Sequence, residues 1–370
     1  RQGKYQAALE LFQKALVIVK QIDDQIGKRI IFMSIGNVYE RQKEYQKALN
    51  YFQQALAISK QIDSKNTQGV LLNNIGDVYF NLREYQKALN YYQQALVIAQ
   101  TNGEKAGEGI IIKNIGEVYE RQRKYQKALD YYQKALAIAQ QIDDKANEGK
   151  IITKIGIVYE HQGEYQNALD YYQQALTISK QINNKFIELV TLGRIGQVYS
   201  NQGEYQKALD YHQQTLTISK EISNKLAEGR SLNYIGNVYR SQGEYQKALN
   251  YFQQALAISK QINKKNSESI SLNNIGEVYR SLGEYQKALD YLQQALKITK
   301  KIGDKANQGK IINNIGLVYN HLGQYQKSLD YYQQALAISK QIGDKVFETI
   351  ILNNFGFVYQ SQREYLKAKY

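Results

Sequence analysis

Hydrophobic residues between positions 71 and 98 form two stripes in which neighbours are three or four residues apart. The first stripe contains Leu72, Ile75, Val78, Tyr79 and Leu82. The second contains Tyr85, Ala88, Leu89, Tyr92, Ala95, Leu96 and Ile98. This spacing puts each set on one side of an α-helix, so the segment is predicted to form two amphipathic helices. We refer to them as helix A and helix B.

The pair of helices recurs along the whole chain with a period of 40 residues. A glycine marks each helix A, at Gly36, Gly76, Gly116, Gly156, Gly196, Gly236, Gly276, Gly316 and Gly356. A tyrosine follows each of them three residues later, and residues 44–62 are identical to residues 244–262. This constant interval predicts a repeat array. The anchor glycine is expected to lie where helices A and B cross closely.

Turn and capping signals separate the helices. Helix A is followed by a glycine suited to a left-handed turn at Gly163, Gly203, Gly243, Gly283 and Gly323. A basic residue takes this place at Lys43, Arg83, Arg123 and Arg363, where the same turn is more strained. Residues suited to cap the next helix A are Asp24, Ser64, Asp144, Asn184, Asn224, Asp304 and Asp344. Connections this short predict antiparallel neighbours.

The predicted fold is therefore all-α, a right-handed superhelical solenoid of antiparallel helix pairs. Residues 1–24 are expected to form a lone helix B. Complete repeats are expected at 25–64, 65–104, 105–144, 145–184, 185–224, 225–264, 265–304 and 305–344, with a partial repeat at 345–370. Because neither end shows a polar capping repeat, we expect a piece of a longer solenoid that can self-associate end to end.

Composition argues against an enzyme. The chain has no cysteine and only three histidines, none paired at metal-ligand spacing. No glycine-rich phosphate loop follows a strand. Carboxylates such as Glu120 and Glu160 recur once per repeat, as surface positions do. We expect no catalytic activity, no metal and no cofactor.

Charge and hydropathy suggest the kind of partner. No segment is long and apolar enough for a transmembrane helix, and the lack of cysteine fits a reducing compartment, so a cytoplasmic protein without membrane contact is expected. The net charge of +14 favours acidic partners. Lysines that recur at one helix B position, such as Lys87 and Lys207, are interpreted as a solvated face. Nucleic acid is disfavoured because acidic residues interrupt the basic positions.

The order of the motif residues resembles the tetratricopeptide repeat. Leu72, Ile75, Gly76, Tyr79, Tyr85, Ala88, Tyr92 and Ala95 match its signature in sequence order. Arg83 and Gln100 depart from its usual glycine and closing proline, and each unit has six additional residues. This longer unit is similar to the extended repeats of the LGN/Pins and kinesin light chain families and of bacterial signalling proteins. The resemblance covers essentially the whole chain.

The resemblance implies that helix A lines a concave groove and that asparagines there clamp a peptide backbone. The corresponding asparagines are Asn73, Asn74, Asn114, Asn233, Asn237, Asn273, Asn313 and Asn353. Asparagine is a mediocre helix former, and its carboxamide offers the donor and acceptor that an extended backbone needs. The alternative is that these side chains bond to neighbouring helices and hold the solenoid together. Both roles can apply to different copies.

Basic residues dominate the same face from residue 150 onward. They are Lys150, Lys154, Arg194, Arg230, Arg240 and Arg280, with Glu277 as the main opposing charge. Arginine binds carboxylates through two parallel hydrogen bonds, so this part of the groove is predicted to favour an acidic segment. Drift of charges on a solvated face is the alternative.

The repeat at residues 185–222 departs most from the others. Gly193 and Arg194 replace the asparagine pair, His212 stands where most copies have an aromatic ring, and Thr215 replaces a packing alanine. A specificity pocket, a hinge and a tolerated imperfection are all open. His212 is expected to be a hydrogen-bonded core residue.

The predicted function is a non-enzymatic scaffold that binds a protein or peptide, acidic by preference, in the groove. Alternatives are the sensor arm of a larger signalling protein, nucleic-acid binding and structural head-to-tail assembly. Residues that scarcely vary between copies specify the fold, whereas the varying face of helix A is where specificity must lie.

Overall fold

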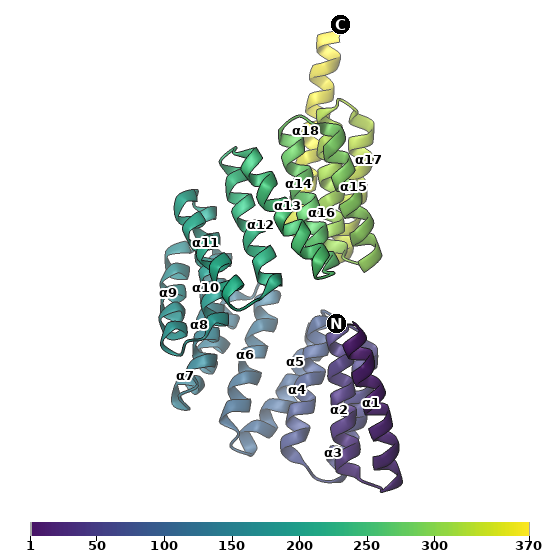
Figure 1. Cartoon of the computed structure of the whole chain (residues 1–370), viewed down its shortest axis with the longest axis vertical. Coiled ribbons are helices and arrows are strands. Elements are labelled where there is room, and N and C mark those ends of the chain that lie inside the picture. Colours follow the sequence, from purple (N-terminus) through teal and green to yellow (C-terminus); the bar gives the residue numbers. More distant parts are fainter. Residues whose placement is uncertain (1, 370) are drawn as a thin grey trace. The chain divides into compact units, whose positions relative to one another are not determined.

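The structure, a computed structural model, describes the backbone of residues 2–369 and the side chains of residues 5–362. Within this range the chain is entirely helical, and its eighteen helices are joined by short connections (Figure 1). The all-α prediction of repeated helix pairs is confirmed.

The helices alternate between the two predicted types. Helix A corresponds to α2 (Gln25–Arg41), α4 (Lys65–Asn81), α6 (Lys105–Arg121), α8 (Lys145–Gln162), α10 (Lys185–Asn201), α12 (Lys225–Ser241), α14 (Lys265–Ser281), α16 (Lys305–His321) and α18 (Lys345–Lys369). Helix B corresponds to α1 (Gln2–Gln21), α3 (Tyr45–Gln61), α5 (Tyr85–Thr101), α7 (Tyr125–Gln141), α9 (Tyr165–Gln181), α11 (Tyr205–Glu221), α13 (Tyr245–Gln261), α15 (Tyr285–Ile302) and α17 (Tyr325–Ile342).

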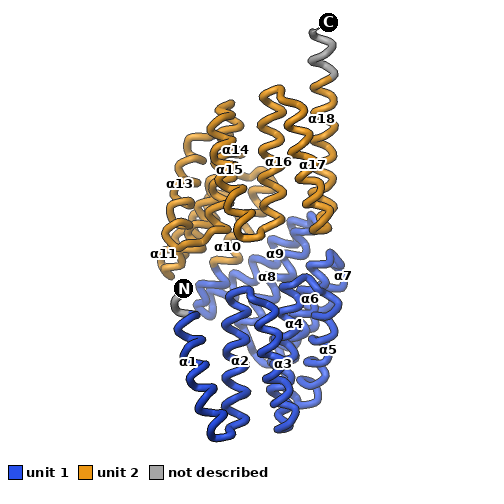
Figure 2. Tube along the Cα trace, turned by 90° about the vertical axis from the view of Figure 1, so that its right-hand side faces the viewer, with its two compact units in different colours: residues 1–188 blue, residues 189–370 orange. Residues whose placement is uncertain are grey.

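The chain divides into two compact units, residues 1–188 and residues 189–370, which Figure 2 colours separately. Each helix packs against the next from α1 to α9 in the first unit and from α11 to α18 in the second. Successive A helices also touch, for example α4 with α6 and α14 with α16. In the second unit α12, α14, α16 and α18 touch in turn and form a continuous layer, so side chains one repeat apart can meet.

The anchor glycine allows a large helix B side chain to cross helix A. A Cβ atom added at Gly76 would lie 2.6 Å from the ring of Tyr92, and one at Gly236 would lie 2.6 Å from the ring of Phe252. The rings are fully or almost fully buried. A side chain at the anchor would displace the ring that fills the core, which confirms the predicted close crossing.

The turns after helix A adopt the left-handed conformation that the glycines predict, with φ of +80° at Gly163. Lys43, Arg83 and Arg123 adopt it too, with φ of 64°, 63° and 59°. Arg363 is different, because α18 continues through it to Lys369. In the described residues no helix follows α18 whose packing would offset the strain of a left-handed turn, so the expected break at Arg363 was wrong.

Most predicted caps are observed. The side chains of Asp24, Asp144, Asn224 and Asp304 accept hydrogen bonds from backbone N–H groups in the first turn of the following helix A. Ser64 does not, because its hydroxyl donates to Thr67 Oγ1 and accepts from Arg29. Ser64 therefore precedes the helix, as predicted, but its side chain does not cap it.

Tyrosine pairs join helix A to helix B on the side where the recurring lysine lies. Tyr79 and Tyr91 stack with ring centroids 5.3 Å apart, and the same pairing occurs in eight repeats. Lys87 Nζ lies 5.2 Å from the Tyr79 ring centre and 2.6 Å from Glu84. The recurring lysine is solvent-exposed, as expected, but it also covers an aromatic ring.

Candidate functional site

Asparagine side chains connect successive A helices within each unit. Asn314 Nδ2 donates to Asn273 Oδ1 at 2.9 Å, and Asn354 Nδ2 donates to Asn313 Oδ1 at 2.8 Å. In the first unit Asn114 Nδ2 donates to Asn73 Oδ1 at 3.0 Å. Each bond spans 41 residues, so it joins one repeat to the next. These are the neighbouring-helix bonds of the alternative interpretation, and the clamp remains a proposal.

Asn233 is one of the buried asparagines of the second unit, together with Asn274 and Asn313. Its Nδ2 donates to Gly229 O at 3.0 Å and to Ser271 Oγ at 3.1 Å, and its Oδ1 accepts from Asn274. Burial of a carboxamide is tolerated when its hydrogen bonds are made. Asn233 is thus primarily a link between α12 and α14.

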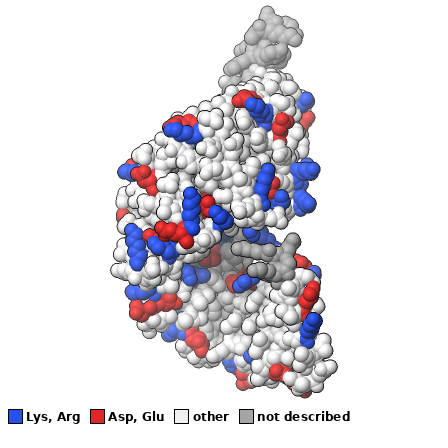
Figure 3. Space-filling model, viewed as in Figure 1, with Lys and Arg blue, Asp and Glu red and all other residues white. Residues whose placement is uncertain are grey.

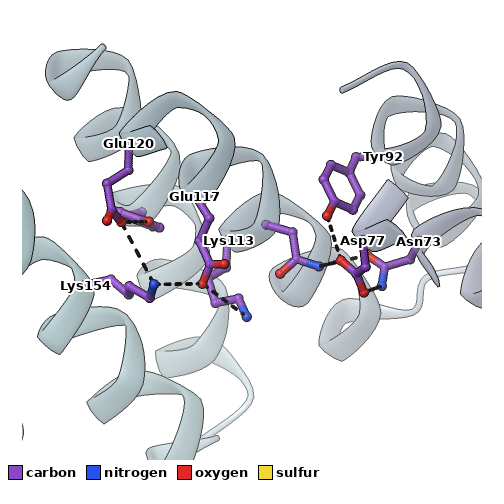
Figure 4. A network of polar contacts seen from close by, with 9 residues as sticks. Asn73, Asp77, Tyr92, Lys113, Glu117, Glu120 and Lys154 are labelled. Carbon is purple, nitrogen blue, oxygen red and sulfur yellow. Dashed lines mark hydrogen bonds and ion pairs between the residues drawn. The ribbon is translucent and has the colours of Figure 1, made fainter. Parts of the chain in front are cut away.

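Asp77 lies at the centre of a polar cluster in the first unit (Figure 4). The Tyr92 hydroxyl donates to Asp77 Oδ1 at 2.6 Å, and Asn73 Nδ2 donates to Oδ2 at 3.2 Å. Burial raises the pKa of Asp77 to about 6, and the hydrogen bond from Tyr92 opposes this rise. Burial and the neighbouring carboxylate raise the pKa of Tyr92.

Two further carboxylates of the first unit accept hydrogen bonds from core tyrosines. Tyr132 donates to Glu120 Oε2 at 2.6 Å, and Tyr172 donates to Glu160 Oε2 at 2.6 Å. Burial is the main cause of the raised pKa of Tyr132. The expectation that Glu120 and Glu160 occupy ordinary surface positions was wrong, because each tyrosine reaches across the anchor crossing to them.

Lys154 neutralises acidic residues of the preceding helix A. Its Nζ lies 3.2 Å from Glu117 Oε1 and 4.0 Å from Glu120 Oε2, between the two carboxylates (Figure 4). Lys113 lies 3.8 Å from the same Glu117 oxygen. Charges on this face of the first unit are therefore largely balanced within the chain.

In the second unit, arginines take the place of Glu120 and Glu160. Arg240 pairs with Glu277, whose other oxygen accepts from Asn273 and Asn314 at 2.8 Å each. Arg280 contacts the ring nitrogen of His321 at 3.3 Å, and its Nε is buried without a hydrogen-bond partner. Burial, followed by the charge of Arg280, lowers the pKa of His321, which favours the neutral ring.

The remaining candidates differ in accessibility. Lys150, Arg230 and Asn353 are exposed, whereas Asn74 and Arg194 are half-buried. Asn237 is also half-buried, and its Oδ1 has no hydrogen-bond partner in the structure. The structure brings Arg230, Asn233, Asn237 and Arg240 together on α12 and places Asn273, Arg280 and Asn313 on the next two A helices. Lys150 and Lys154 lie in the other unit.

His212 is buried, as predicted, but its Nδ1 lacks the expected hydrogen bond. The ring stacks on Tyr234 with centroids 5.0 Å apart, and burial lowers the pKa of His212 to about 4. Thr215 is well accommodated because its hydroxyl donates to His212 O at 2.7 Å and lies 2.9 Å from Ser231 Oγ.

The face of the molecule in Figure 3 shows no single block of charge among the residues that it colours. On the face in Figure 3, lysine and arginine side chains are interspersed with aspartate and glutamate. Among the residues that the structure describes, no group of three or more metal-binding side chains comes together. No described helix has the length and apolar character that crossing a bilayer requires.

Sequence comparison defines the class of protein. The Tetratricopeptide repeat family matches residues 1–61, 67–141, 147–221, 227–301 and 308–370. The chain therefore belongs to the tetratricopeptide repeat family. A search of curated proteins found no match.

Solved structures share the fold at low sequence identity. The apo quorum sensor NprR from B. thuringiensis has a TM-score of 0.64 and 18% identity, over 91% of this chain and 99% of that one. The Rap conjugation gene regulator of the plasmid pLS20, in complex with the Phr* peptide, has a TM-score of 0.61 and 15% identity, over 91% and 96%. A Signal Transduction ATPase with Numerous Domains from Pyrococcus horikoshii, which has a tetratricopeptide repeat sensor, has a TM-score of 0.57 and 18% identity, over 88% of this chain and 54% of that one.

Sequence reasoning missed the hydrogen bonds from core tyrosines to acidic residues. A signal for them was present, since Glu120 precedes Tyr132 by the same twelve residues that separate Glu160 from Tyr172. It also missed the exposed apolar side chains of Val70 and Ile110 on the same face of α4 and α6.

Proposed function

We propose that the chain is a non-enzymatic scaffold that binds an acidic peptide on the second unit. The binding surface is one face of α12, α14 and α16, to which each helix contributes the same four positions of the repeat. We name it the asparagine face. It comprises Arg230, Asn233, Asn237, Arg240, Ile270, Asn273, Glu277, Arg280, Lys310, Asn313, Leu317 and Asn320.

Arg280 is the observation that carries this proposal. Among the described residues, Arg240 forms an ion pair with Glu277, but Arg280 forms none with a carboxylate. Within the described part of the chain the guanidinium makes one polar side-chain contact, to the His321 ring, and its Nε is unsatisfied. A half-buried guanidinium without an anion is a strong site for a peptide carboxylate, because it offers a planar fork of donors.

The asparagines can bind a peptide without leaving their helix contacts. Asn273 uses one N–H to reach Glu277 and one oxygen lone pair to accept from Asn314. A carboxamide has two N–H groups and two lone pairs, so one donor and one acceptor are left over. Asn273 is half-buried rather than enclosed, which keeps that remaining capacity accessible.

Proteins of similar fold support a peptide as the ligand class. One is a Rap regulator in complex with the Phr* peptide, and another is a Rap protein complexed with Competence and Sporulation Factor. Exposed Arg230 and Lys310 flank the asparagines and add positive charge that suits an acidic segment.

A direct test compares fluorescent hexaglutamate, hexaglutamine and hexalysine peptides by anisotropy. The proposal predicts binding of hexaglutamate alone, weakened about thirtyfold when Asn273→Ala and Arg280→Gln are combined. Lys207→Gln is the matched control because Lys207 is an exposed cation on the tyrosine side of the repeat. Equal binding of the three peptides, or an unchanged affinity in the double variant, contradicts the proposal.

A sensor role in a larger signalling protein is a second candidate. It is favoured by the similarity to the tetratricopeptide repeat sensor of the Pyrococcus horikoshii ATPase, of which this chain covers 54%. Sequencing the gene around this segment tests it: an adjoining ATPase or other effector domain supports a sensor arm, and a gene without one counts against it.

A further inference from the structure

A cavity of about 230 Å³ opens between α4, α5 and α6 in the first unit. It is lined mainly by apolar groups, including Gly69, Val70, Ile98, Ala99, Gly107 and Ile110. We name it the socket. Val70 and Ile110 at its edge are 52% and 41% exposed, so apolar surface continues from the socket onto the face that carries Asn73.

In other repeats a side chain fills the corresponding place. Ile187 lies 3.6 Å from the Cβ position of Gly149, and Phe347 lies 3.1 Å from that of Gly309. These residues correspond to Gly107, two repeats and six repeats further along the chain. Where Asn147 takes the place of Gly107, the matching cavity beside Gly109 is only about 10 Å³. The socket is therefore the space that a side chain at position 107 would fill, left open because Gly107 has none.

The size and charge of the socket specify what fits. An apolar cavity of about 150 Å³ accommodates benzene, so this one can take a leucine or phenylalanine side chain. Glu104 is the one charged residue among the lining residues; it is exposed and accepts from Asn66 Nδ2 at 2.8 Å. Its remaining acceptor capacity suits a cation beside the apolar group.

We propose that the socket anchors a branched aliphatic or aromatic side chain of a bound peptide, next to a lysine or arginine that pairs with Glu104. This inference rests on the proposed function of peptide binding and adds a site in the other unit. The bound side chain takes the place that Ile187 and Phe347 occupy in their own repeats, and the cation complements the carboxylate at the edge.

The test uses the capped dipeptide N-acetyl-leucyl-lysine amide and the full chain. Binding is followed by NMR through the backbone amide shifts of Gly69 and Gly107. We expect N-acetyl-alanyl-lysine amide to bind about fiftyfold more weakly, because it lacks three buried carbons. N-acetyl-leucyl-glutamate amide should also bind more weakly, and Glu104→Gln should remove the difference between lysine and glutamate.

Gly107→Ile is the decisive variant, since it supplies the side chain that Ile187 supplies elsewhere. A Cβ atom at Gly107 meets only ordinary contacts, 3.8 Å to Glu104 and 4.0 Å to Ala99, so the variant should fold. It should lose dipeptide binding, whereas Gly107→Ala, which leaves the socket open, should keep it. Retained binding in Gly107→Ile overturns the proposal, as does equal binding of the leucyl and alanyl probes.

Self-association is measured in the same samples by sedimentation. A dimer that Gly107→Ile dissociates, without dipeptide binding to the wild type, would assign the socket to a second copy and overturn a peptide ligand. Hexaglutamate binding separates the two proposals: if it persists while the dipeptide fails, the socket is wrong and the asparagine face stands.

Discussion

Glu120 in the first unit and Arg280 in the second occupy the same position of the repeat, but their surroundings are opposite. Glu120 accepts a hydrogen bond from buried Tyr132, whereas Arg280 stands opposite buried Leu292. The carboxylate of Glu120 therefore has a hydrogen-bond donor within the fold, whereas the guanidinium of Arg280 contacts the ring of His321. The same helix position is bonded within the fold at Glu120, whereas at Arg280 no carboxylate of the described residues pairs with the guanidinium.

Some repeats have only one partner of the tyrosine–carboxylate pair seen at Tyr132 and Glu120. Glu40 stands opposite Phe52, which has no hydroxyl, and burial raises the pKa of Glu40 while Arg41 opposes the rise. Tyr332 stands opposite Asn320 rather than a carboxylate. A tyrosine or an acid alone therefore does not create the contact; the repeat must supply both.

The largest expected effect comes from the crossing that both units share. Gly76→Ala forces a Cβ atom within 2.6 Å of the rigid Tyr92 ring, whereas the closest atom to a Cβ at Gly276 is Cγ of flexible Leu292 at 2.8 Å. We expect Gly76→Ala to lower the free energy of unfolding by about 3 kcal/mol and Gly276→Ala by clearly less. Urea denaturation of both variants measures this, and equal losses would contradict the role of ring rigidity.

Asp77 should make the stability of the first unit depend on pH. Its folded-state pKa of about 6 lies above the ordinary value of 3.8, so the neutral carboxyl stabilises the fold at low pH and this contribution is lost as pH rises through about 6. Asp77→Asn should therefore be more stable than the wild type at neutral pH, by at most about 3 kcal/mol. The difference should vanish below about pH 4; a constant difference across this range would contradict the raised pKa.

Removal of a buried tyrosine hydroxyl should affect the stability of the two units differently. Tyr132→Phe leaves Glu120 without its short hydrogen bond, so we expect a loss of about 2 kcal/mol. Tyr332→Phe is the matched control because its hydroxyl is buried without a hydrogen-bond partner, so this variant should lose no stability and should gain about 1 kcal/mol. Thermal and urea unfolding of both variants are compared, and similar losses would remove the distinction between the units.

His212 should give a smaller effect. Its folded-state pKa of about 4 lies below the ordinary 6.5, so its neutral form supports the fold and stability falls as pH decreases from about 6.5 towards 4. His212→Phe removes the unsatisfied Nδ1 and should stabilise the chain by about 1 kcal/mol at neutral pH, more in acid. A variant that is less stable than the wild type would show that the ring nitrogen is satisfied.

The sequence was informative wherever one residue decides a local feature. The period, the anchor glycines and the left-handed turns follow from single residues repeated in phase, and the structure confirms them. The hydrogen bond from Tyr132 to Glu120 depends on two residues meeting across a crossing, which helical periodicity alone does not show. The socket depends on the absence of a side chain at Gly107, which becomes visible only beside Ile187 and Phe347.

The asparagines illustrate the limit most clearly. Their alignment predicted either a peptide clamp or bonds between neighbouring helices, and the structure shows bonds from one repeat to the next, as between Asn314 and Asn273. A one-dimensional pattern identifies that these residues share a face but does not say how many of their donors and acceptors the fold already uses. That number decides whether a peptide can bind there.

The most direct test of the account is the salt dependence of hexaglutamate binding to the wild type and to Arg280→Gln. Affinity for the wild type should fall steeply between about 50 and about 200 mM salt, because surface charges are screened over roughly a Debye length. Arg280→Gln should bind about tenfold more weakly at low salt and show a shallower dependence. Identical curves for the two proteins would contradict the claim that Arg280 receives a carboxylate from an acidic peptide.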